Sequence, residues 1–317
     1  MLVVPRERWD QARRRLDPTP CRPDENGSGT TLDDTKRGTS VADTRTIVIT
    51  GASDGIGAVA ARELAGPDVD LIIVGRSEEK TKAVAAEVGA TAFTADYARF
   101  DEVRALAGDI AARVDSIDVL LNNAGGTFAP AQKTADGHEP NFQINHLSGF
   151  LLTNLLKEQL AADGGALVVN TSSFGNLAGS VDLTDLDFER RRTIELRCYG
   201  TSKLENIMFT RGIADRWRDD GIVSAAVHPG VVASSFGRDS AFVGLFYRTP
   251  LKRFGTITLE QGAQPLIALA RRGADPEING VYFDRLKPNG RENKQAHRRD
   301  LIDGLWAASE KFVGVGV

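Results

Sequence analysis

Cysteine, histidine and long apolar runs are scarce in this chain of 317 residues. Two cysteines, Cys21 and Cys198, make no disulfide framework, so we expect a reducing, cytoplasmic environment. Four scattered histidines form no ligand cluster in the sequence, and no metal site is predicted. No apolar run reaches the roughly 18 residues that cross a bilayer, so we expect no membrane anchor. The net charge of −4 argues against a nucleic-acid partner.

Residues 1–43 differ from the rest of the chain. They are rich in Arg, Asp, Pro, Thr and Gly, and they lack the apolar segment of a secretory signal. A disordered extension is therefore expected over 1–43, followed by one domain over 44–317. A natural translation start near Val41 is an alternative, because valine codons can serve as starts.

Within the domain, short apolar runs alternate with stretches of helical period. This alternation predicts an α/β fold with a single Rossmann-type, doubly wound parallel sheet of about seven strands flanked by helices. The strands are expected at 46–50, 70–74, 91–94, 117–121, 166–170, 222–227 and 280–283. The later helices are expected at 78–88, 100–114, 143–161, 199–218 and 259–271, with a final one within 292–312.

A glycine-rich segment follows the first strand. It reads Thr-Gly-Ala-Ser-Asp-Gly-Ile-Gly from Thr50 to Gly57 and opens a helical pattern. Glycines between a strand and a helix permit a tight turn and close approach of backbone N–H groups to a pyrophosphate. The segment therefore predicts a dinucleotide site rather than a simple turn.

Farther along, Tyr199 and Lys203 lie four residues apart within a predicted helix, on one face. A free tyrosine titrates near pH 10, and a neighbouring positive charge lowers the pKa of a phenol. The pair is therefore predicted to supply the proton in an acid–base reaction. The adjacent Cys198 is interpreted as a packing residue.

These motifs, with others in the same order, resemble the short-chain dehydrogenases/reductases over about residues 45 to 290. The resemblance rests on the glycine segment, Asn122-Asn123-Ala124-Gly125, Asn145, Ser173, the Tyr199/Lys203 pair and His228-Pro229-Gly230. Within the family the chain looks most like the retinol dehydrogenase and protochlorophyllide reductase-like branch. That likeness rests on Glu260 to Gln264, on Gly280 to Phe283 and on a long insert between Ser173 and Tyr199.

The resemblance implies an oxidoreductase that interconverts a carbonyl and an alcohol. Ser173 would bind the substrate oxygen, with Ser172 as the neighbouring alternative; Tyr199 would be the general acid/base. Lys203 would bind the cofactor ribose, and Asn145 would position a water in a proton relay. A carbon–carbon double-bond reductase or an epimerase stays open. A non-catalytic regulator is disfavoured because all four residues are present.

The same resemblance implies the cofactor site. Arg76 follows the second strand and favours NADP(H) over NAD(H), because a guanidinium binds a 2′-phosphate. Asp54 departs from the basic residue that NADP users often place there. Asp96 is either an adenine contact or a helix N-cap, and Ser234 replaces a threonine. The predicted cofactor-binding residues are Gly51, Ser53, Asp54, Gly55, Ile56, Gly57, Arg76, Asp96, Asn123, Ala124, Gly125, Tyr199, Lys203, Pro229, Gly230, Val232 and Ser234.

Two further expectations concern partners. A substrate lid is expected near 234–256, and its aromatic residues predict a small apolar carbonyl or alcohol substrate. By analogy with the family, helices 143–161 and 199–218 could pair two chains into a homodimer or homotetramer. The second helix favours this because it carries more apolar residues than one face needs: Leu204, Ile207, Met208 and Ile213.

Overall fold

A computed structural model describes residues 44–129, 132–192, 194–232 and 256–316. The predicted N-terminal extension and nearly all of the predicted lid lie outside the described residues. The strands are β1 (Arg45–Thr50), β2 (Val69–Gly75), β3 (Thr91–Thr94), β4 (Val119–Asn122), β5 (Leu167–Thr171), β6 (Val223–His228), β7 (Val281–Asp284) and β8 (Lys287–Pro288). The longer helices are α2 (Gly55–Leu64), α3 (Glu78–Val88), α4 (Phe100–Arg113), α6 (Ser148–Leu155), α8 (Glu195–Arg216), α11 (Leu259–Arg272) and α12 (Arg299–Val313).

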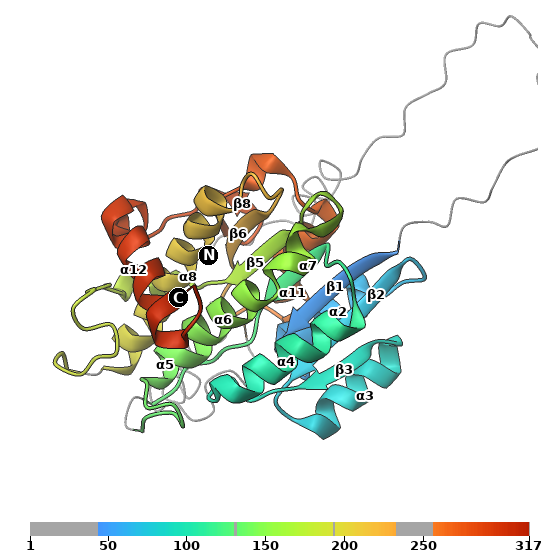
Figure 1. The fold of residues 1–317 in the computed structure, drawn as a ribbon, viewed down its shortest axis with the longest axis horizontal. Helices are drawn as coiled ribbons and strands as arrows, with labels where there is room; N and C mark the ends of the chain where they lie inside the picture. Colours follow the sequence, from blue (N-terminus) through green and yellow to red (C-terminus); the bar gives the residue numbers. More distant parts are fainter. Residues whose placement is uncertain (1–43, 130–131, 193, 233–255, 317) are drawn as a thin grey trace, which may run out of the picture. The chain divides into compact units, whose positions relative to one another are not determined.

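One sheet contains all eight strands in the order β3-β2-β1-β4-β5-β6-β7-β8 (Figure 1). Strands β1 to β7 pair in parallel, and only the short β8 runs antiparallel to its neighbour. The predicted doubly wound parallel sheet is confirmed. The sequence missed β8, a two-residue strand that is too short to leave a pattern.

Helices cover both faces of the sheet, which explains why its central strands are apolar without alternation. Successive residues of β1 show the division, since Ile47 and Ile49 join one core and Val48 joins the other. Helices α2, α3 and α11 enclose the first core, and α4, α6, α8 and α12 enclose the second. The carboxyl ends of the parallel strands therefore remain available for a site.

The helix predicted at 143–161 is broken in the structure. A short helix α5 (Pro140–Phe142) leads into a π-helical turn η1 (Gln143–Leu147), which continues into α6; α7 (Lys157–Ala161) follows after Leu156. Turns of this type are rare and occur often at functional sites. The turn contains Asn145, one of the predicted catalytic residues.

The C-terminal helix α12 packs against α8, and Figure 1 shows the two side by side. Its Trp306 ring lies 5.1 Å from Phe150, 5.7 Å from Phe209 and 5.6 Å from Trp217, measured between centroids. The four apolar residues that suggested pairing of chains through α8 are buried inside this core. These residues are covered within one chain, so they give no reason to expect oligomers. Oligomerisation itself stays a prediction.

Candidate active site

A cavity of about 460 Å³ opens at the carboxyl ends of the strands. It brings together nearly all of the predicted site residues, although Asn145 lies behind its wall and Ser234 falls outside the described residues. The predicted residues that line the cavity are Gly51, Ser53, Asp54, Gly55, Ile56, Gly57, Arg76, Asp96, Asn123, Ala124, Gly125, Ser173, Tyr199, Lys203, Pro229, Gly230 and Val232.

The glycine segment forms a close turn between β1 and α2. Gly51 has a φ of +67°, and a Cβ on Gly57 would lie 2.3 Å from the Gly51 carbonyl oxygen. Around Gly55, by contrast, a Cβ would meet nothing within 4 Å, so the backbone at the start of α2 faces open space. A pyrophosphate fits this arrangement, because the N–H groups of a helix N-terminus attract anions.

Strand β4 is fastened to this turn by side-chain hydrogen bonds. The Thr50 hydroxyl oxygen accepts the backbone N–H groups of Asn123 and Ala124, both at 3.0 Å. The Asn123 side chain donates to the Thr50 carbonyl at 3.0 Å. Asn122 points into the protein and donates to Asn170 and Thr153, as expected of a structural residue.

Three predicted catalytic side chains converge at the other end of the cavity. Ser173 follows β5, and Tyr199 and Lys203 extend from α8. The Lys203 ammonium lies 5.7 Å from the centre of the Tyr199 ring and donates to the Thr171 carbonyl at 3.2 Å. The Ser172 hydroxyl donates to the Lys203 carbonyl at 2.7 Å, so the geometry favours Ser173 as the residue that reaches a substrate.

Asn145 braces the wall of the site. Its side-chain oxygen accepts the Gly126 N–H at 2.8 Å, and its amide donates to the Gly126 carbonyl at 2.9 Å and to Ser202 at 3.0 Å. Gly125 separates it from the lysine, because a Cβ there would lie 2.5 Å from the Asn145 oxygen and 3.3 Å from the Lys203 nitrogen. Only glycine leaves these two side chains in place.

Similarity to known proteins identifies the family to which this site belongs. The family model described as short chain dehydrogenase matches residues 45–241. The chain belongs to the short-chain dehydrogenase/reductase family. Members of this family bind NAD(P) and act as oxidoreductases on CH–OH and C=O groups.

Two relatives place the chain within the family. A protein of Streptomyces sp. strain C5, whose name assigns it daunorubicin C-13 ketoreductase activity, is 38% identical over 85% of this chain and 93% of its own. Human retinol dehydrogenase 13 is 33% identical over 86% of this chain and 85% of its own. The predicted retinol dehydrogenase-like branch is therefore confirmed.

Solved structures agree with the fold. A Mycobacterium paratuberculosis protein of uncharacterised function has a TM-score of 0.68 at 30% identity, and the match covers 86% of this chain and 94% of that protein. A structure titled as an NAD(P)-dependent gluconate 5-dehydrogenase from Beutenbergia cavernae, with bound NADP, has a TM-score of 0.58 at 26% identity. That match covers 83% of this chain and 97% of the other.

Burial controls the titration of the dyad in this dehydrogenase/reductase. It raises the pKa of Tyr199 to about 12, although a hydrogen bond between Tyr199 and Ser173 acts in the opposite direction. Burial also lowers the pKa of Lys203 to about 7. Desolvation disfavours the charged form of both groups. The lowering of the tyrosine pKa by Lys203 stays a prediction for the enzyme with its cofactor bound.

A second cation lies beside Arg76 in the cavity wall. Lys80 follows it by four residues and lies 3.4 Å from the Asp54 carboxylate. The Asp54 side chain in turn accepts the Gly55 N–H at 2.7 Å and caps α2. Sequence reasoning noted the missing basic residue at Asp54 but overlooked Lys80, and its spacing from Arg76 was the available signal.

Asp96 and His228 differ from what the sequence suggested or add to it. Asp96 is not the N-cap of α4, which is Arg99; its carboxylate accepts the Ala98 N–H at 3.0 Å within the preceding turn. His228, from the His228-Pro229-Gly230 motif, also lines the cavity. Burial lowers its pKa to about 4, so the imidazole is neutral at pH 7.

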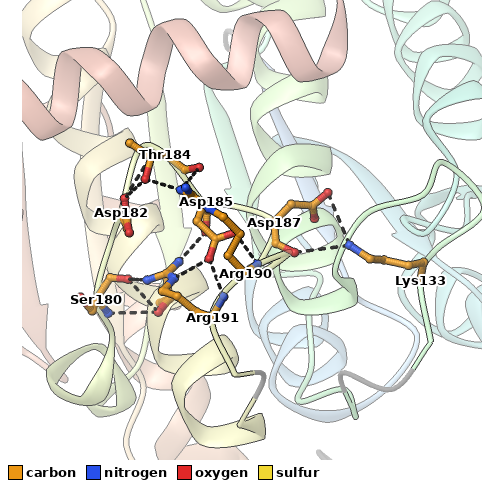
Figure 2. Close-up of polar contacts among 9 residues, drawn as sticks. Lys133, Ser180, Asp182, Thr184, Asp185, Asp187, Arg190 and Arg191 are labelled. Carbon is orange, nitrogen blue, oxygen red and sulfur yellow. Dashed lines mark hydrogen bonds and ion pairs between the residues drawn. The ribbon is translucent and has the colours of Figure 1, made fainter.

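The insert before α8 is held by charged side chains, which Figure 2 shows. The Asp185 carboxylate accepts the backbone N–H groups of Arg190 and Arg191 at 3.0 and 2.9 Å, and Arg191 also donates to the Ser180 carbonyl. Asp187 lies 3.7 Å from Lys133, so the insert is tied to the segment that follows β4. These contacts hold residues 180–191 of the insert in place.

The described residues contain neither a metal-ligand cluster nor a membrane-spanning helix. Within residues 44–129, 132–192, 194–232 and 256–316, no three His, Cys, Asp or Glu side chains form a group that could hold a metal ion. None of the helices in this part of the chain combines the length and apolar character of a membrane span.

Proposed function

We propose that this chain is an NADP(H)-dependent oxidoreductase that interconverts a carbonyl and an alcohol on an apolar small molecule, with Tyr199 as the general acid/base. The observation that carries the proposal is the convergence of Ser173, Tyr199 and Lys203 at one end of the cavity whose other end is the glycine turn. A cofactor laid along this cavity would have its pyrophosphate at α2 and its reactive end beside the dyad.

Each side chain has a role that its contacts support. When bound, the nicotinamide ring donates or accepts the hydride. The Ser173 hydroxyl oxygen accepts the Gly175 N–H at 3.1 Å, which leaves its proton to be donated to Tyr199 or to the substrate oxygen. Tyr199 transfers a proton to that oxygen during reduction. Lys203, 2% exposed, donates to the Thr171 carbonyl and lines the cavity, where it would hold the cofactor ribose.

Apolar residues around the catalytic end support an apolar substrate. Phe174 follows Ser173, Leu196 lies one helical turn before Tyr199, and Val231 follows Gly230; all three are exposed. The names of the relatives point the same way, since daunorubicin ketone and retinol are both substrates with large apolar parts. We infer that the body of the substrate lies over these side chains.

The reaction type is tested with a substrate panel. Purified enzyme is mixed with NADPH and with aryl, alkyl and polycyclic ketones and aldehydes, and NADPH oxidation is followed by absorbance. We expect turnover of apolar carbonyls and none of isolated enones. Turnover of enones alone would support a double-bond reductase, and NADPH binding without turnover of any compound would support a regulator.

Cofactor choice is tested by removing Arg76. Arg76→Ala should weaken NADPH binding by roughly tenfold to a hundredfold, because a charge-assisted bond to the 2′-phosphate is worth about 1.5–3 kcal/mol. NADH binding should change little. Isothermal titration measures both, and Lys82→Ala is the matched control, since Lys82 is an exposed cation of α3 paired with Glu78 outside the cavity wall. Equal losses for both cofactors would refute the assignment.

A further inference from the structure

The segment before α12 is fastened to the segment that follows Ser173. The backbone N–H of Asn293 donates to the side-chain oxygen of Asn176 at 2.8 Å. The Asn293 side chain donates to the carbonyls of Gly179 and Asn176 at 2.9 and 3.3 Å. Residues more than a hundred positions apart are thereby joined next to the catalytic end of the cavity.

Asn176 carries this connection on to Ser173. Its side-chain amide donates to the Ser173 carbonyl at 2.7 Å and to the Tyr282 hydroxyl at 3.3 Å. Its backbone N–H also donates to the Ser173 carbonyl, at 3.0 Å. The Asn176 side chain is fully buried, and each of its polar groups has a partner in the protein.

The turn after Ser173 also packs directly against α8. It forms the short 3₁₀ helix η3 (Phe174–Ala178), in which Asn176 alone is buried. At Gly175 a Cβ would lie 3.0 Å from the Tyr199 ring, so the backbone itself packs against the tyrosine. A small shift of this turn would move both the Ser173 hydroxyl and the surface that contacts Tyr199.

We propose that Asn176 is a positioning residue for the reaction, holding the Ser173 hydroxyl at Tyr199 through its bonds to the Ser173 carbonyl and to Asn293. The inference rests on the proposed function, since it requires that Ser173 act in the reaction. Asn176 itself does not line the cavity. Its effect is carried by the Ser173 backbone, and the Gly175 N–H then orients the hydroxyl.

A double-mutant cycle tests the inference. Ser173→Ala, Asn176→Ala and the double variant are compared by kcat on the best carbonyl substrate of the panel. Asn176→Ala should lower kcat by up to about a hundredfold, because small displacements of reacting groups have effects of this size. In the Ser173→Ala background the same change should have almost no effect, because residues that act through one another are not additive.

A pH profile supplies a second readout. The Ser173 bond opposes the rise in the pKa of Tyr199, so Asn176→Ala should shift the kinetic pKa of Tyr199 upward. Gln295→Ala is the matched control: Gln295 makes the same kind of amide bonds from the same segment, but to the backbone of Val181. It should lower the melting temperature while leaving kcat and the pH profile close to the parent's.

The outcomes separate the inference from the proposed function. A Ser173→Ala enzyme with parental kcat would overturn the role of Ser173, and the proposed mechanism with it. Two results would overturn only the inference, provided that Ser173→Ala lowers kcat. One is an Asn176→Ala enzyme with parental kcat. The other is a double variant in which the losses in kcat of the two single variants multiply. If Asn176→Ala fails to fold, Asn293→Ala replaces it in the cycle. This change removes the side-chain bonds to Asn176 and Gly179 and the bond that the Asn293 oxygen accepts from the Gln295 N–H, and it keeps the backbone bond to Asn176.

Discussion

Replacing Tyr199 by phenylalanine is expected to reduce turnover by about a hundredfold to ten-thousandfold, the usual contribution of a general acid. This corresponds to roughly 3–5 kcal/mol of transition-state stabilisation. Tyr199→Phe removes one oxygen and keeps the ring, so its packing against Gly175 should persist. The affinity for NADPH should therefore stay nearly unchanged. Stopped-flow kinetics measure the rate of hydride transfer, and fluorescence titration measures the affinity for NADPH.

A neighbouring change provides the control for Tyr199→Phe. Cys198 is buried in the same turn of α8, and burial raises the pKa of its thiol to about 12, so it is inert as a nucleophile. Cys198→Ala should retain turnover. If Tyr199→Phe kept most of its activity while folding normally, a different proton donor would have to be sought.

Replacing Lys203 by methionine is expected to abolish turnover and yet raise the stability of the free enzyme at pH 7. Burial lowers the pKa of this lysine from 10.5 to about 7. Since one pKa unit corresponds to about 1.4 kcal/mol, a charged lysine here lowers the free energy of unfolding by several kcal/mol. Lys203→Met removes that charge, and the Thr171 carbonyl keeps its bond from Asn206 at 3.1 Å.

The pH dependence gives the sign of the Lys203 effect. Between about pH 7 and 10.5 the unfolded chain holds a proton on Lys203 that the folded chain has lost, so the free energy of unfolding rises with pH in this window. The melting temperature of Lys203→Met should therefore exceed the parent's clearly at pH 7 and by less at pH 9.5. A methionine variant that is less stable than the parent at pH 7 would contradict the argument. Lys82→Met, a change on the surface, should leave the melting temperature close to the parent's at both pH 7 and pH 9.5.

Local patterns predicted the sheet and most of the site. The glycine turn, Ser173 and the Tyr199/Lys203 pair each depend on residues that are near one another in the sequence. Lys80 could have been found in the same way, because it lies four residues from Arg76. These features needed no knowledge of the folded chain.

Local sequence patterns could not predict the contacts between segments that are distant in the sequence. The bonds between Asn176 and Asn293 span 117 positions, and neither asparagine belongs to a recognisable motif. The break in the predicted helix at 143–161 likewise reflects tertiary bonds, since Asn145 is held by Gly126 and Ser202. The apolar residues of α8 suggested a second chain because the sequence does not show that α12 covers them.

The cover that α12 provides has a consequence for biosynthesis. Translation delivers the Rossmann strands and α8 before residues 299–313. Until then Phe150, Phe209 and Trp217 lack the Trp306 ring that closes over them. Nascent chains that stop short of α12 therefore expose an aromatic surface and are prone to aggregate. Closure of this aromatic core is thus coupled to the synthesis of α12.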